Sequence, residues 1–148
     1  MVEISSFIVM KNFSIKDTMR IIGDNGLGIA FVTESDGTLC GTVTDGDIRK
    51  ALGAGANILL NIEQIMNKDP IKVKEDFTIE SIRSQLGKRG KTYSKFYTLK
   101  IPIINDAGGV INMIIYDIHD NKYELLHDLR SHPSKDVKKV LIVGGAGY

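Results

Sequence analysis

The feature that most constrains the fold of this 148-residue chain is an internal duplication. The segment at 26–48, GLGIAFVTESDGTLCGTVTDGDI, aligns without a gap with TLKIPIINDAGGVINMIIYDIHD at 98–120, at an offset of 72 (109 − 37) that places Gly37 on Gly109. Upstream, FIVMKNFSIKDTMRII at 7–22 aligns with IKVKEDFTIESIRSQL at 71–86 at an offset of 64 (78 − 14). The difference of eight residues lies in the insertion GKRGKTYSKFYT at 87–98. Such a duplication predicts a structural unit that packs against its own copy.

Each copy carries the same order of local signals: strand, helix, strand, strand, helix. In the first copy we expect strands at 7–10, 29–33 and 39–44, a helix that Ser14 caps, and a helix over 46–52. In the second copy we expect strands at 71–74, 101–105 and 110–115, a helix that Thr78 caps, and a helix at roughly 119–129. The predicted class is therefore α+β, as tandem β-α-β-β-α repeats with pseudo-two-fold symmetry. Residues 1–60 form the first repeat, 61–128 the second, and 129–148 a linker with the start of a further domain.

The stretch Thr44-Asp45-Gly46-Asp47 lies where the last strand of the first repeat meets a helix. Thr44 and Asp45 are placed to cap that helix, whose free N–H groups favour an anion such as phosphate. Gly46 leaves room for a ligand near the backbone. The carboxylate of Asp47 has enough acceptor sites to take both hydroxyls of a ribose. The alternative is that Thr44 and Asp47 only cap the helix.

The duplication, the order of elements and the stretch GTVTDGDIRKAL at 41–52 together resemble a pair of CBS domains, also called a Bateman module. The resemblance covers about residues 5–125, and it implies a regulatory module that binds AMP, ADP, ATP or S-adenosylmethionine in the cleft between its repeats. It also implies a homodimer. Carried over by position, the nucleotide-binding residues would be Thr42, Thr44, Asp45, Asp47, Pro70, Ile71, Thr78, Thr98, Leu99 and Lys100. At the offset of 72 the mirror-related site has Tyr116 for Thr44 and His119 for Asp47, which predicts a degenerate second site.

Composition excludes several other functions. With 19 basic and 18 acidic side chains the net charge is +1, which argues against a nucleic-acid partner. Cys40 is the one cysteine, so neither an internal disulfide nor a multi-cysteine metal site can form. No apolar run approaches the roughly 20 residues of a membrane span, and the first residues do not resemble a secretion signal, so we expect a cytoplasmic protein. We find no catalytic residues or metal ligands, and we expect that the chain itself is not an enzyme.

The last residues, KKVLIVGGAGY at 138–148, resemble the first strand and glycine-rich turn of NAD-dependent sugar-nucleotide epimerases and dehydratases. Gly144 and Gly147 match the first two glycines of that family's fingerprint, but no helix follows to receive a pyrophosphate. NAD would therefore bind only in a downstream domain. Two functions remain open: a nucleotide sensor in front of such an enzyme, and a ligand-free module that mediates dimerisation.

Overall fold

The computed structural model describes residues 3–126. The first repeat contains a short 3₁₀ helix η1 (Ile4–Phe7), β1 (Ile8–Met10), α1 (Ile15–Asn25), β2 (Ile29–Thr33), β3 (Leu39–Thr44) and α2 (Asp45–Gly53). A connecting segment with a second 3₁₀ helix, η2 (Ile62–Gln64), leads to β4 (Val73–Lys74), α3 (Ile79–Lys88), β5 (Thr98–Ile104), β6 (Val110–Asp117) and β7 (Lys122–Leu125). The sequence predicted the bounds of β2 and β3 correctly.

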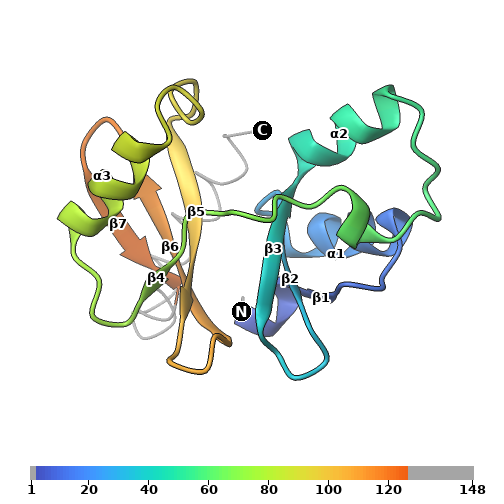
Figure 1. The fold of residues 1–148 in the computed structure, drawn as a ribbon, viewed down its shortest axis with the longest axis horizontal. Helices are drawn as coiled ribbons and strands as arrows, with labels where there is room; N and C mark the ends of the chain where they lie inside the picture. Colours follow the sequence, from blue (N-terminus) through green and yellow to red (C-terminus); the bar gives the residue numbers. More distant parts are fainter. Residues whose placement is uncertain (1–2, 127–148) are drawn as a thin grey trace.

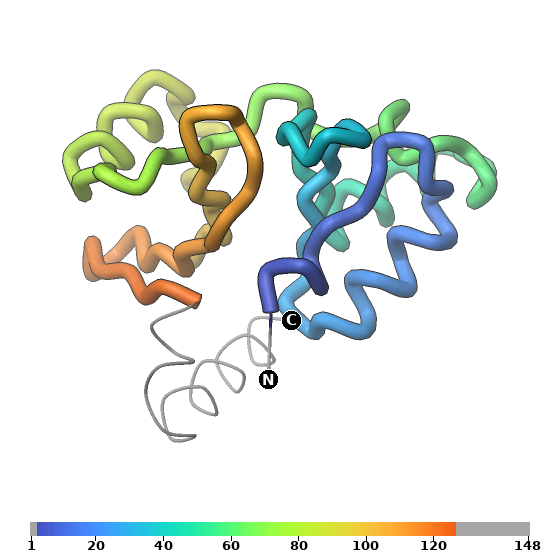
Figure 2. Tube along the Cα trace, turned by 90° about the horizontal axis from the view of Figure 1, so that it is seen from below, coloured from blue at the N-terminus to red at the C-terminus, as the bar shows by residue number. Residues whose placement is uncertain are grey.

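The two repeats form two sheets that face each other, with the helices on the outside (Figure 1). The first sheet has the order β1-β2-β3 and the second the order β4-β5-β6-β7. In each sheet the first strand runs parallel to the second, and the following hairpin is antiparallel. The view in Figure 2 shows the same separation into two halves, joined by the connecting segment. The α+β class and the tandem repeats are confirmed.

Three apolar clusters hold these layers together, which is the pattern expected for sheets that are covered on both faces. One cluster lies between the first sheet and its helices and includes Val9, Ala30, Val32 and Val43. Its counterpart in the second repeat includes Val73, Ile101, Ile103 and Ile114. The third cluster joins the two repeats and includes Phe7, Ile29, Phe31, Met113 and Leu126, with Ile115 packed against it. Alternate residues of each strand therefore face either a helix or the other repeat.

The predicted offset of 72 between the repeats is wrong by one residue. Ile29 pairs with Thr44, and the matching pair in the second sheet is Lys100 with Ile115, which gives an offset of 71 (100 − 29). The hairpin turns agree, because Gly37 and Gly108 have nearly equal positive φ angles of 93° and 90°. A slip of one residue moves every side chain of a strand to the opposite face of the sheet. The correction therefore changes which side chains line the cleft.

The predicted helix at 119–129 is also wrong over residues 119–125. A turn at 118–121 leads instead to β7, whose residues pair antiparallel with β6 from Ile114↔Leu125 to Asp117↔Lys122. Asn121 adopts a left-handed conformation with φ 56° in this turn, which asparagine tolerates better than most residues. The ring of Tyr123 packs edge-on against that of Phe77, with centroids 5.0 Å apart. These non-local contacts favour a strand over the helix that the local sequence suggested.

The predicted helix caps are confirmed. The hydroxyl of Ser14 accepts a hydrogen bond from the backbone N–H of Asp17, and Thr78 forms a reciprocal capping box with Ser81. The predicted linker and glycine-rich turn at 129–148 lie outside the described residues. Within residues 3–126, none of the helices is long and apolar enough to cross a bilayer.

Candidate functional site

The start of α2 carries the polar residues that the sequence singled out. Thr44 is the N-cap, and its side chain accepts a hydrogen bond from the backbone N–H of Asp47 at 3.2 Å. In return, the carboxylate Oδ2 of Asp47 accepts one from the N–H of Thr44 at 3.0 Å. This capping box fixes both side chains at the helix start. Because a carboxylate has about four acceptor positions, Asp47 retains capacity for a ligand.

Lys100 brings a positive charge from the second repeat toward this helix start. It occupies the position of β5 that corresponds to Ile29, so its side chain leaves the sheet on the face that is turned toward the first repeat. Burial lowers the pKa of Lys100, and the negative charge of Asp45 opposes that shift. Lys100 therefore lies half-buried on the face of the second sheet between the repeats.

The other predicted residues differ in how they are placed. Thr42 is buried, and its backbone pairs with Asn67 of the connecting segment through two hydrogen bonds of 3.1 and 2.8 Å. Thr98 is half-buried and lies on the same face of β5 as Lys100, two residues away. The structure therefore groups these threonines with the sheet faces between the repeats.

Four of the predicted residues have structural roles or face elsewhere. Pro70 is buried in the connecting segment, and Ile71 belongs to the cluster beneath α3. Leu99 packs against that same cluster, on the face of β5 opposite to Lys100. Thr78 caps α3, a helix that lies on the outer side of the second sheet (Figure 1). Ile71, Leu99 and Thr78 therefore lie on the helix side of the second sheet, whereas Lys100 lies on the side that is turned toward the first repeat.

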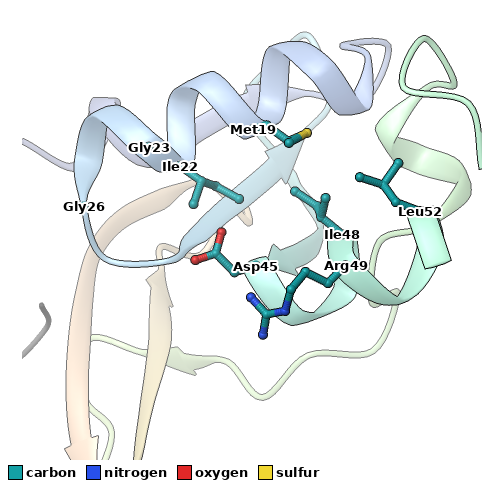
Figure 3. Close-up of a pocket in the computed structure, with 8 residues that line it drawn as sticks. All are labelled: Met19, Ile22, Gly23, Gly26, Asp45, Ile48, Arg49 and Leu52. Atoms are coloured by element: carbon teal, nitrogen blue, oxygen red, sulfur yellow. The ribbon is translucent and has the colours of Figure 1, made fainter. Parts of the chain in front are cut away.

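Arg49 is a candidate that the sequence analysis missed. Its Nη2 lies 3.8 Å from the position that a Cβ on Gly46 would occupy, so the guanidinium reaches back to the first turn of α2. Figure 3 shows Asp45 and Arg49 near each other at one end of a groove between α1 and α2. The groove has a volume of about 270 Å³, and its apolar lining includes Met19 and Leu52. The signal in the sequence was the spacing Gly46-x-x-Arg49, since residues three apart share a helix face.

The mirror-related position in the second repeat lacks these polar groups. With the corrected offset of 71, Thr44 corresponds to Ile115 and Asp47 to Ile118, rather than to Tyr116 and His119. Tyr116 points into the cluster beneath α3, and its hydroxyl donates a hydrogen bond to the side-chain oxygen of Asn121. As expected, the second repeat has neither the threonine nor the aspartate at these positions, but the residues that stand there differ from those that the offset of 72 predicted.

A comparison with protein families supplies the identification. The model for the CBS domain matches residues 4–54 and again 62–117, which together make up most of the chain. The chain belongs to the CBS-domain family. CBS domains are generally regulatory rather than catalytic, and the two matched segments coincide with the two repeats.

Solved structures of CBS domains share this fold. The CBS domain pair of protein MJ0100, in complex with 5′-methylthioadenosine and S-adenosyl-L-methionine, is 24% identical with a TM-score of 0.60, over 77% of this chain and 86% of that one. The cytosolic domain of the Mg²⁺ channel MgtE, in complex with ATP, is 15% identical with a TM-score of 0.57, over 77% of this chain and 42% of that one. The CBS-domain protein ATU1752 from Agrobacterium tumefaciens is 22% identical with a TM-score of 0.56, over 77% and 79%. No curated protein matches the chain by sequence.

Proposed function

We propose that this CBS pair is a regulatory module that binds an adenine nucleotide between its repeats, at the start of α2. The observation that carries the proposal is the capping box of Thr44 and Asp47 at the start of α2, together with the position of Lys100 on the face of β5 that is turned toward the first repeat. In this position Asp47 is suited to accept hydrogen bonds from a ribose, and Thr44 and Lys100 are suited to contact a phosphate. Neighbours of the same fold that contain ATP, or 5′-methylthioadenosine and S-adenosylmethionine, support a ligand of this class.

The ligand would act by holding the repeats in one relative arrangement. Its contacts come from both repeats, so its affinity depends on how the repeats sit, and binding shifts that population. Among the other predicted residues, Thr42 and Thr98 are proposed to line the cleft. Pro70, Ile71 and Leu99 are proposed to shape it through the backbone, and Thr78 is the least favourably placed of the set.

The test uses Asp47→Ser, because the structure contains a capping box in which serine holds the same position. In α3, Ser81 fills the role that Asp47 fills in α2. The variant should therefore keep the helix cap and lose the carboxylate. We expect AMP binding, measured by isothermal titration calorimetry, to weaken at least about tenfold, while the melting temperature stays within a few degrees. Unchanged affinity in this variant, or no binding of any adenine ligand by the unaltered protein, would refute the proposal.

A second proposal is that the α1–α2 face mediates a homodimer. The groove between these helices is lined mainly by apolar residues, with Asp45 and Arg49 at one end. The exposed side chains of Met19, Ile58 and Leu59 lie on α1 and the segment after α2, with exposed fractions of 43%, 43% and 69%. Exposed apolar side chains beside an apolar groove are typical of an interface. Met19→Glu should convert a dimer to a monomer in light scattering after gel filtration. A monomeric unaltered protein would exclude this interface.

The link to an NAD-dependent epimerase or dehydratase rests on the sequence alone. Residues 138–148 lie outside the described residues, and the family match ends at residue 117. We infer from the sequence pattern of residues 138–148, which resembles the apolar segment and glycine-rich stretch of those enzymes, that the module is associated with an NAD-dependent enzyme of this kind. Detection of NAD that co-purifies with the protein expressed from its native gene would test this inference.

A further inference from the structure

The connection between α3 and β5 lies in a segment of concentrated positive charge. Residues 81–105 contain six of the 19 basic side chains and no acidic one, whereas the rest of the chain has 13 basic and all 18 acidic side chains. The formal net charge is therefore +6 over this segment and −5 over the remainder. A partner that meets this segment alone encounters a positive surface, although the net charge of the whole chain is close to zero.

This connection is longer than the fold requires. In the first repeat, residues 26–28 suffice to join α1 to β2, whereas residues 89–97 join α3 to β5. Successive backbone hydrogen bonds between residues three apart fold the connection into tight turns, from Arg89 to Thr92 and from Tyr93 to Phe96. The additional residues therefore favour a role beyond joining a helix to a strand.

The connection is held in place on the second repeat. The ring of Tyr93 packs against the cluster beneath α3, and Arg89 donates a hydrogen bond to the backbone oxygen of Asp69. At the other end, the N–H of Ile118 donates to the oxygen of Tyr97 at 2.9 Å. A surface that is already ordered loses little conformational freedom when it binds a partner.

Five side chains of this region are exposed, and we name them the insertion surface: Lys88, Lys91, Lys95, Phe96 and Tyr97. The two aromatic residues have exposed fractions of 42% and 74%. The three lysines form no ion pair with any residue in 3–126. Exposed aromatic side chains are typical of the centre of an interface, and the lysines beside them favour an acidic partner.

The contacts of the two rings argue against nucleic acid as that partner. Unpaired bases bind proteins by stacking on free aromatic faces. The ring of Tyr97 already packs against His119, with centroids 4.9 Å apart, and the ammonium of Lys95 lies 5.6 Å from the ring centroid of Phe96. A long polyanion would also meet the remainder of the chain, with its net charge of −5. A short acidic segment of a protein avoids both difficulties.

We propose that the insertion surface binds an acidic segment of another protein, in which aliphatic side chains alternate with carboxylates. The carboxylates form charge-assisted hydrogen bonds with Lys88, Lys91 and Lys95, and the aliphatic side chains cover the exposed parts of Phe96 and Tyr97. This proposal is independent of the nucleotide site and gives the module a protein partner.

The experiment measures fluorescence anisotropy of a fluorescein-labelled peptide of four Glu-Glu-Leu repeats, titrated with the 148-residue chain at low salt. We expect saturable binding that weakens severalfold as the ionic strength rises. A peptide of four Glu-Glu-Ser repeats, which has the same charge and lacks the aliphatic side chains, should bind severalfold more weakly. Replacing Lys88, Lys91 and Lys95 together with glutamine should weaken Glu-Glu-Leu binding at least about tenfold. Replacing Phe96 and Tyr97 with serine should make the two peptides bind equally.

The matched control replaces Lys16, Lys50 and Lys68 with glutamine. These lysines are exposed and lie outside the insertion, so the control removes the same charge elsewhere and should keep the affinity. Melting temperatures by circular dichroism should stay within a few degrees in both lysine variants, because every altered side chain is exposed. Absence of saturable binding, or an equal loss in the control, would overturn the proposal. Tighter binding of an oligouridylate of the same charge, or of phosphatidylserine vesicles, would also overturn it and would assign the surface to nucleic acid or to a membrane.

Discussion

Replacing Gly41 with alanine tests how the connecting segment fixes the two repeats. Gly41 lies in β3, where the connecting segment crosses the sheet. A Cβ at this position would lie 2.5 Å from the backbone oxygen of Asn67 and 2.9 Å from the sulfur of Met66. The sulfur belongs to a flexible side chain, but the oxygen belongs to the backbone and cannot move alone. The connecting segment must therefore shift away from β3.

The cost of that shift follows from the hydrogen bonds at the crossing. The N–H of Thr42 donates to the oxygen of Asn67 at 3.1 Å, and the N–H of Asn67 donates to the oxygen of Thr42 at 2.8 Å. Losing both bonds costs about 1–3 kcal/mol. The smaller entropy of alanine in the unfolded chain returns about 0.4–1 kcal/mol. The net loss should be about 1–2 kcal/mol, which corresponds to a fall in Tm of roughly 3–8 °C for a chain of this size.

Thermal unfolding followed by circular dichroism measures this fall, and Gly53→Ala provides the control. Gly53 is the last residue of α2, and a Cβ there would meet no atom within 4 Å. Alanine is a better helix former than glycine, so Gly53→Ala should leave Tm unchanged or raise it slightly. If Gly41→Ala melts at the same temperature as Gly53→Ala, the connecting segment does not constrain β3 as argued.

Two further predictions concern single side chains. Tyr116→Phe removes the hydrogen bond to Asn121 and should lower the free energy of unfolding, measured by urea denaturation, by about 1 kcal/mol. The affinity for AMP should stay unchanged, because the ring faces α3 and not the cleft. A large loss of AMP affinity would support the offset of 72 instead of 71. Burial and the carboxylate of Glu34 raise the pKa of Cys40 to about 11, so alkylation by iodoacetamide at pH 8 should be much slower than for a free thiol. Because the folded pKa lies above the unfolded value of about 8.5, this thiol's contribution to stability is complete below pH 8.5 and should be lost as the pH rises toward 11. Rapid alkylation at pH 8 would contradict the burial argument.

Local chemistry explains why much of the fold could be predicted. Ser14, Thr44 and Thr78 cap their helices because a hydroxyl beside free N–H groups needs no distant partner. The duplication likewise follows from the order of residues alone.

The predictions were wrong where contacts between residues far apart in the sequence determine the structure. The stretch 122–125 contains residues that suit a helix, yet it pairs with β6 because Leu125 reaches the cluster beneath α3. The predicted alignment of the two repeats depended on which of two adjacent glycines, Gly108 or Gly109, corresponds to Gly37. Only the positive φ angle of Gly108 shows that it is the equivalent residue. Arg49 was missed because the path of its side chain back to Gly46 is a property of the folded helix.

The corrected register explains why only one of the two pseudo-symmetric positions in the cleft between the repeats carries polar side chains. In the first repeat the pair at the end of the hairpin is Ile29 and Thr44, and in the second it is Lys100 and Ile115. The two polar members, Thr44 and Lys100, come from opposite repeats and are not each other's pseudo-symmetric equivalents. Their equivalents, Ile115 and Ile29, both pack in the apolar cluster between the sheets. At one pseudo-symmetric position the two repeats therefore present Thr44 and Lys100 on the faces between them, and at the related position they present two isoleucines. Each chain is accordingly expected to bind one ligand.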